Sequence, residues 1–197
     1  MNLSKEITDI LNTLNIDEAI QNKKKRDLID FLKQFSEDEI KNYEDQIFNY
    51  NTHDILDKIK AKLEFVETVE QRKQYDYYRY TISSVPQPKM FPGKILQMLV
   101  RDETNQKVLG LIQLSQDSLT NQQKYDYLEQ IYDTLKVGKF NKQHKRIFRD
   151  AGVNISACVP IQPFGYNYCG GKLLAKIAFS KEVFDYYYKK FGIKIKY

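Results

Sequence analysis

The chain has 197 residues, 42% of them apolar, which is enough to bury the core of one domain or of one domain with a helical extension. Its two cysteines exclude a disulfide framework, and its two histidines lie far apart in sequence, so we expect no metal site. The N-terminus lacks a signal-peptide pattern, and no apolar run reaches the about 20 residues that cross a bilayer. We therefore expect a cytoplasmic protein without a membrane anchor.

The net charge of +5 is unevenly distributed along the chain. Residues 1–70 hold 16 acidic and 10 basic residues, a net charge of −6. Residues 71–197 hold 10 acidic and 21 basic residues, a net charge of +11. The second part is therefore the one suited to an anionic partner, either a nucleic acid or a phosphate-bearing cofactor.

Residues 1–70 are predicted to form a helical region, and they contain neither Gly nor Pro. Apolar residues recur at helical spacing in Lys5–Leu14, Asp27–Phe35 and Asp54–Val69. Ser36 is followed three residues later by Glu39, the pattern of a capping box at the start of another helix.

The predicted strands all lie beyond residue 70. Tyr80–Ser84 is predicted as a strand, and the apolar runs Lys94–Arg101 and Lys107–Ser115, joined by a polar turn, predict a β-hairpin. Both runs are apolar on both faces, so we expect helices to cover the sheet. Val153–Val159 predicts a further strand, and Ile193–Tyr197 a short last one.

Three more helices are predicted in the second part, at Leu119–Leu135, Lys172–Phe179 and Lys181–Phe191, the last ended by Gly192. The chain is thus assigned to the α/β class (α+β), with a helical N-terminal region at residues 1–70 and an α/β core at residues 71–197.

The glycine-bearing turn between the last strand of this core and the next helix is the first candidate site. Gly165, Gly170 and Gly171 allow a ligand to approach the backbone, and the free amides of a helix start favour phosphate. Lys172 adds a cation where the helix dipole disfavours one, which a bound anion would explain. The alternative is an ordinary turn with a solvated lysine.

The order of elements resembles the acyl-CoA-dependent N-acetyltransferase superfamily, the GNAT fold. Val108–Ile112 resembles the strand pattern that precedes a helix in that superfamily, and Gly170 with Leu173–Leu174 resembles the end of its pyrophosphate-binding turn. The turn departs from the pattern, because Gly165 and Tyr168 stand where a Gln or Arg and the first Gly are expected.

The closing segment Tyr188–Ile193 also resembles that superfamily, whose tyrosine can act as general acid for the leaving thiolate. The resemblance implies a GNAT-like mixed sheet and acetyl-CoA or another acyl-CoA as cofactor. It implies Tyr188 as the catalytic residue and, as cofactor-binding residues, Gly165, Asn167, Gly170, Gly171 and Lys172. A complete sheet of that fold would need two strands after the last helix. We therefore expect C-terminal strands that are short or missing, with an acceptor wall that is either missing or supplied by another chain.

A narrower resemblance covers roughly Lys94–Gly192. This stretch is similar to a domain of phage and large-virus proteins related to the A subunit of the Druantia antiphage system. It implies a viral or mobile-element context, with the host cytoplasm or the virion as location and nucleic acid or viral particle subunits as partners.

The run Lys136–Arg149, which holds six bases and no acid, is the second candidate site. Interleaved with aromatic and aliphatic residues, it could bind nucleic acid through Lys139, Lys142, Lys145, Arg146 and Arg149, or it could be a solvated basic loop.

Two weaker candidates complete the set. The cluster Tyr75–Tyr80 could stack bases, although packing within a strand is the simpler interpretation. Cys169 could be a nucleophile at a helix start, but no histidine is near it in sequence.

Two functions remain open. The leading hypothesis is a viral or phage-type acyltransferase-like domain that binds acyl-CoA at the glycine turn. The alternative is a non-catalytic viral or phage protein that uses the same fold as a scaffold for nucleic acid or other subunits.

Overall fold

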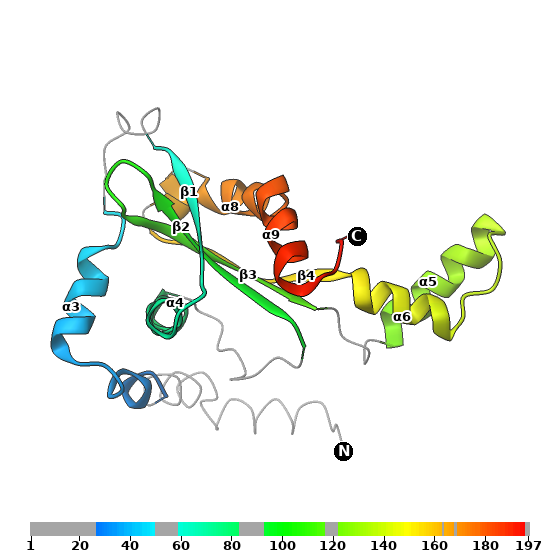
Figure 1. Cartoon of the computed structure of the whole chain (residues 1–197), viewed down its shortest axis with the longest axis horizontal. Coiled ribbons are helices and arrows are strands. Elements are labelled where there is room, and N and C mark those ends of the chain that lie inside the picture. The colour runs from blue at the N-terminus through cyan, green and yellow to red at the C-terminus, as the bar shows by residue number, and fades with distance from the viewer. Residues whose placement is uncertain are drawn as a thin grey trace, which may run out of the picture.

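The structure is a computed structural model that describes residues 27–49, 59–82, 93–116, 122–162, 164–167 and 169–195. Its four named strands form one antiparallel sheet in the order β1-β2-β3-β4 (Figure 1). Their bounds are β1 (Ala61–Phe65), β2 (Ile95–Asp102), β3 (Val108–Gln116) and β4 (Val153–Pro160). The predicted α/β class is confirmed, whereas the helix predicted at Lys5–Leu14 lies outside the described residues.

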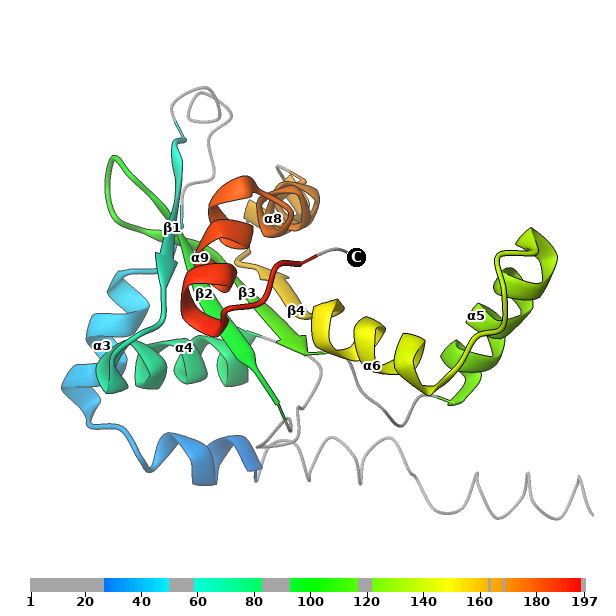
Figure 2. The same cartoon turned by 45° about the vertical axis from the view of Figure 1, so that its right-hand side comes forward.

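Helices cover both faces of this sheet, as the hairpin pattern predicts. One face carries α3 (Glu37–Asp45) and α4 (Val69–Ile82), and the other carries α8 (Gly170–Ala178) and α9 (Lys181–Phe191) (Figures 1 and 2). The short α7 (Phe164–Asn167) precedes α8. Between β3 and β4 the chain leaves the sheet as α5 (Gln122–Leu135) and α6 (Lys142–Ala151), a helical hairpin that projects from the body (Figure 2). We call residues 122–151 the arm.

The predicted hairpin at Lys94–Ser115 is confirmed as β2 and β3, and the pleat of these strands divides the core in two. One set of side chains, including Met98 and Ile112, packs with Leu174 of α8. The alternate set, including Leu99 and Leu111, packs with the tyrosines of α4. Burial on both faces explains why neither strand shows a polar alternation.

Gly110 of β3 lies where a side chain of α8 packs directly on the sheet. A Cβ atom at Gly110 would lie 2.4 Å from Leu174 Cδ1 and 2.8 Å from the carbonyl oxygen of Val159. Close packing between Gly110 and Leu174 therefore explains these two residues, which in the sequence resemble N-acetyltransferase motifs. Leu174 is fully buried against the strand, and no side chain fits between them.

Local capping signals set the starts of several helices. The predicted capping box of α3 is present: Glu39 N donates to Ser36 Oγ over 3.2 Å, and Ser36 N donates to the Glu39 carboxylate over 2.8 Å. Thr68 and Gln71 form the same reciprocal pair at the start of α4. Gly192 ends α9 in the left-handed region, as predicted.

A buried arginine joins the first half of the chain to the sheet. Arg101 of β2 donates from Nε to the Glu64 carboxylate on β1, from Nη1 to Gln46 Oε1 over 3.1 Å, and from Nη2 to Gln74 Oε1 over 2.9 Å. Gln46 is the C-terminal cap of α3 and Gln74 lies on α4. Gln74 in turn donates to Tyr78 Oη over 3.2 Å, so the network is satisfied from end to end.

Three predicted elements differ from the structure. The helix predicted at Asp54–Val69 is wrong for Ala61–Phe65, which pairs with β2 as an edge strand. The strand predicted at Tyr80–Ser84 is wrong for residues 80–82, which continue α4. Ile193–Ile195, the described part of the predicted last strand, is in no strand.

The predicted strand at Val153–Val159 is confirmed as β4, but the sheet is not mixed among its named strands. β4 is antiparallel to β3 and stays paired with it from Gly110–Pro160 to Gln116–Val153, with one register shift. A GNAT cleft would need these two strands to splay apart. The GNAT-like arrangement implied by the resemblance is therefore not the one that β3 and β4 adopt.

We expect Arg101→Met to destabilise the protein strongly, because it leaves the Glu64 carboxylate without its charge partner and removes one donor each from Gln46 and Gln74. Removing one member of such a buried ionic network costs about 3 kcal/mol. Lys62→Met is the matched control, since Lys62 stands opposite Arg101 in the β1–β2 register but is exposed. Urea unfolding followed by circular dichroism measures both, and equal destabilisation of the two variants would contradict the role given to the network.

Candidate functional site

The glycine turn predicted from sequence begins α8, but packing accounts for most of its features. A Cβ atom at Gly170 would lie 2.5 Å from Phe164 Cδ1 and 2.7 Å from the Phe164 carbonyl oxygen. The space beside Gly165 is occupied by the Gln162 amide group. Gly171 differs, because its nearest neighbour outside the helix backbone would be Pro160 Cγ at 3.7 Å.

The backbone of this turn is also partly satisfied within the chain. Cys169 precedes α8 in a left-handed conformation, and its carbonyl oxygen accepts from Lys172 N over 3.0 Å and from Leu173 N over 3.3 Å. These two amides are therefore not available to a phosphate. The Lys172 side chain is exposed, and the side chain of Asn167 lies outside what the structure describes.

Tyr188, the predicted general acid, lies on the outer side of α9 with 58% of its surface exposed. Its neighbour Tyr187 is the buried one, packed in the core between α9 and the sheet. The structure does not bring Tyr188 into contact with the glycine turn in any described interaction, and its role stays a prediction.

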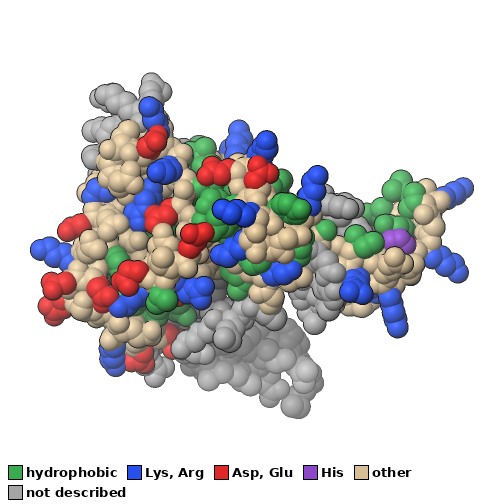
Figure 3. Space-filling view, viewed as in Figure 1, with side chains coloured by type: hydrophobic (Ala, Val, Ile, Leu, Met, Phe, Trp, Pro, Cys, Tyr) green, Lys and Arg blue, Asp and Glu red, His purple; other side chains and the backbone are tan. Residues whose placement is uncertain are grey.

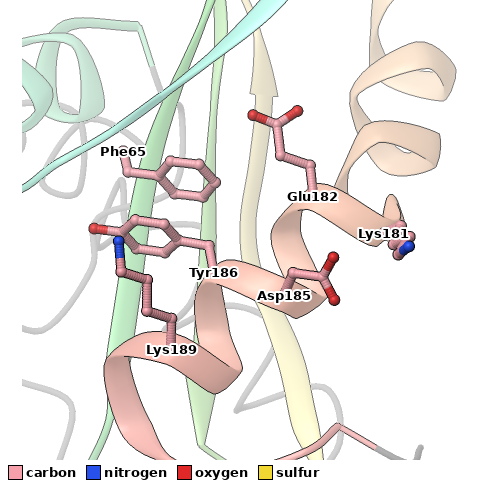
Figure 4. A pocket seen from close by; sticks show the side chains of 6 residues that line it. All are labelled: Phe65, Lys181, Glu182, Asp185, Tyr186 and Lys189. Carbon is pink, nitrogen blue, oxygen red and sulfur yellow. The ribbon is translucent and has the colours of Figure 1, made fainter.

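A shallow depression of about 550 Å³ lies beside Tyr186, where α9 passes over β1. Figure 4 shows the rings of Phe65 and Tyr186 face to face, with Lys189 alongside; the ring centroids are 3.7 Å apart. The Tyr186 hydroxyl donates to the Glu67 carboxylate. Burial and then this hydrogen bond raise the pKa of Tyr186 to about 12. The pair thus clamps an edge strand to a helix, and Tyr186 stays protonated.

The basic run Lys136–Arg149 is not a loop throughout, because from Lys142 onward it forms α6 of the arm. Asn141 caps this helix: its Oδ1 accepts from Gln143 N over 2.9 Å and from His144 N over 3.1 Å, and its own N donates to His144 Nδ1 over 3.1 Å. This is the geometry of a capping box with histidine in the place of glutamate.

Aromatic rings fill the space between the two helices of the arm. The rings of Tyr132 and Phe140 are 5.1 Å apart, and the His144 ring stacks on Phe140 with centroids 5.7 Å apart. Tyr125 is 1% exposed, and the Lys145 ammonium lies 5.1 Å from its ring centroid. This small core holds the arm in shape away from the main body.

Apart from Lys145, the predicted nucleic-acid-binding side chains that the structure describes lie on the surface of the arm. Lys139, Lys142 and Arg146 are exposed, and Lys145 is half-buried over Tyr125. The Arg149 side chain is outside the described residues. Figure 3 shows lysine and arginine side chains extending from the arm. Lys142, Lys145 and Arg146 therefore lie on α6, and Lys139 lies in the connection that precedes it.

Sequence reasoning missed one unusual buried group. Arg79 of α4 is 8% exposed, and its Nε and Nη1 have no hydrogen-bond partner among the described residues. Burial lowers the pKa of Arg79, and the Tyr75 hydroxyl one turn earlier is also without a partner in the described chain. The interpretation of the cluster Tyr75–Tyr80 as packing within a strand was wrong, because these residues belong to α4, and it hid a pair that only helical spacing brings together.

The two cysteines lie in different surroundings. Cys158 is half-buried, and burial raises the pKa of its thiol, while Cys169 is exposed at the start of α8. Within the described ranges no three His, Cys, Asp or Glu side chains gather as a metal site would require. None of the described helices has the length and apolar character needed to cross a bilayer.

Comparison with known protein families identifies a match. The family described as Druantia protein DruA matches residues 13–196, nearly the whole chain. No curated protein and no solved structure matches. These findings agree with the narrower of the two resemblances and give no support to the N-acetyltransferase superfamily.

We expect the two glycines at the start of α8 to respond differently to alanine. Gly170→Ala should destabilise the protein by about 1–3 kcal/mol, because the new methyl group overpacks against Phe164. Gly171→Ala should be neutral or stabilising by up to about 1 kcal/mol, because alanine favours the helix and the space is open. Thermal unfolding measures both. If Gly170→Ala leaves the thermal stability unchanged, packing does not explain this glycine and the ligand-binding hypothesis regains support.

Proposed function

The chain belongs to the family of the Druantia protein DruA, a family of antiphage defence, and we propose that it binds nucleic acid through its arm. Nucleic acid is what a phage introduces into a cell, and a basic surface suits it. The body of the chain then acts as the scaffold that carries the arm.

One observation supports this proposal most: a run of basic residues without an acidic residue, Lys136–Arg149, lies in a projecting helical hairpin. The arm's acidic residues are Asp126, Glu129 and Asp133 on α5, and Asp150 one residue before the end of α6. The first part of α6, which bears Lys142 and Arg146, therefore presents a local positive field. A flexible solvated loop would not need an aromatic core and a cap to fix its shape.

The burial of the rings that lie between the two helices of the arm indicates how nucleic acid would be bound. Tyr125 and Phe140 are buried, and Tyr132 and His144 are half-buried between the helices. These rings cannot serve as a platform on which bases stack. Binding would therefore use lysine and arginine contacts to phosphates, which tolerate any sequence and weaken as salt rises.

The family also supports protein partners. Other subunits of a defence system are the partners that we propose on the basis of the family. Partners within a virion stay a prediction from sequence.

The acyl-CoA hypothesis stays a prediction with less support than the nucleic-acid one. Its glycines at 110 and 170 are explained by contacts with Leu174 and Phe164, and its tyrosine at 188 is on the outside of α9. No described contact favours it.

We expect the triple variant Lys139→Gln, Lys142→Gln, Arg146→Gln to bind nucleic acid more weakly and with a flatter salt dependence. For every phosphate that the variant no longer neutralises, the slope of log K against log salt should fall by about 0.9 on a B-form duplex. Fluorescence anisotropy with a labelled duplex, titrated at several salt concentrations, measures the slope.

The matched control is Lys176→Gln, Lys181→Gln, Lys189→Gln, which removes the same charge from exposed positions of α8 and α9. If both triple variants lose affinity equally, binding follows net charge and not the arm. If the unchanged protein binds neither duplex nor single strands at low salt, the proposal is wrong.

A further inference from the structure

Helix α5 of the arm has a second apolar stripe that α6 does not cover. The first stripe includes Tyr125 and Tyr132, whose rings meet Phe140 inside the arm. The second consists of Tyr127, Ile131 and Leu135, at the four-residue spacing that keeps side chains on one face of a helix. Tyr127 is 63% exposed and Leu135 is 64% exposed, and Ile131 between them is half-buried.

The stripe contains a hollow of about 270 Å³, lined by Tyr127, Gln130, Ile131, Thr134 and Leu135. The first four of these stand at positions i, i+3, i+4 and i+7 of the helix. Four residues at that spacing form the hole that receives one side chain from a facing helix in coiled-coil packing. The shape of the surface therefore fits another α-helix better than a loop or a small molecule.

The stripe is also complementary to itself. Tyr127 and Leu135 are each four residues from Ile131, so an antiparallel copy centred on Ile131 sets Tyr127 of one helix opposite Leu135 of the other. Each helix then offers both the side chains and the hole. We propose that α5 pairs antiparallel with α5 of a second copy of this chain, across a two-fold axis at Ile131.

Charge does not oppose this pairing. Glu129 and Asp133 are each two residues from Ile131, which turns them by about 200° to the far side of the helix. The side chains beside the stripe that line the hollow, Gln130 and Thr134, are uncharged. Like charges of the two copies are thus kept apart, and the polar rim can hydrogen-bond across the pair.

The position of the stripe leaves the basic helix accessible. α6 covers a different side of α5, so a pair built through α5 would carry one basic helix on each flank. From Tyr127 to Leu135 the stripe is about 12 Å long at 1.5 Å per residue. An interface this short gives reversible association, and we expect a dimer that dissociates on dilution.

Cysteine cross-linking tests the two-fold axis directly. In a Cys169→Ser background, which removes the exposed thiol, Ile131→Cys should form a disulfide-linked dimer under mild oxidation, since residues at a two-fold axis meet their own copies. Gln143→Cys, on the exposed surface of α6, is the matched control and should stay monomeric. A dimer from both variants or from neither would overturn the proposed geometry.

Sedimentation velocity over a range of concentrations tests the association without a cross-link. The unchanged protein should shift from monomer to dimer as concentration rises, and Ile131→Glu should lose the dimer. Gln143→Glu makes the same charge change on α6 and should keep it. A protein that is monomeric throughout, or a dimer that survives Ile131→Glu, would show the inference to be wrong. Neither result bears on nucleic-acid binding, which depends on other residues.

Discussion

The buried guanidinium of Arg101 is the constraint on which the first half of the fold depends. β1 is a five-residue edge strand, and α3 and α4 reach the sheet through polar groups as well as through tyrosines. Arg101 presents donors in one plane to Glu64, Gln46 and Gln74, one from each of these elements. A buried charge without partners is energetically costly, so the packing of these three elements around Arg101 is cooperative.

Elements with a local signal were predictable from the sequence, and those defined by distant partners were not. The β2–β3 hairpin and the α9 helix ended by Gly192 follow from periodicity and turn residues alone. β1 does not, because its five residues become a strand only by pairing with β2. α4 is buried on more than one side, so its tyrosines do not form a single apolar stripe and their pattern resembles that of a strand. The Thr68–Gln71 pair, which has the spacing of a capping box, does indicate that a helix begins here.

The candidate sites show the same division. The sequence shows glycines at positions 110 and 170 within recognisable motifs. It cannot tell whether each glycine makes room for a ligand or for a neighbouring side chain of the same chain. The reasons lie with Leu174 and Phe164, which only the folded chain brings to them. The bases of Lys136–Arg149 were visible as charge, but nothing in their spacing showed that a projecting hairpin would carry them.

The arm owes its properties to being built as a unit of its own. Its aromatic core and the Asn141–His144 cap fix the start of α6, so bases that would otherwise move with a loop are held on a rigid helix. Using the inner stripe of α5 for that core leaves the outer stripe uncovered by any part of the chain that the structure describes. An exposed apolar helix face lowers solubility unless something covers it. The same helix that fixes the basic surface is therefore the one with a reason to associate, and pairing through it would set two such surfaces in a defined relation.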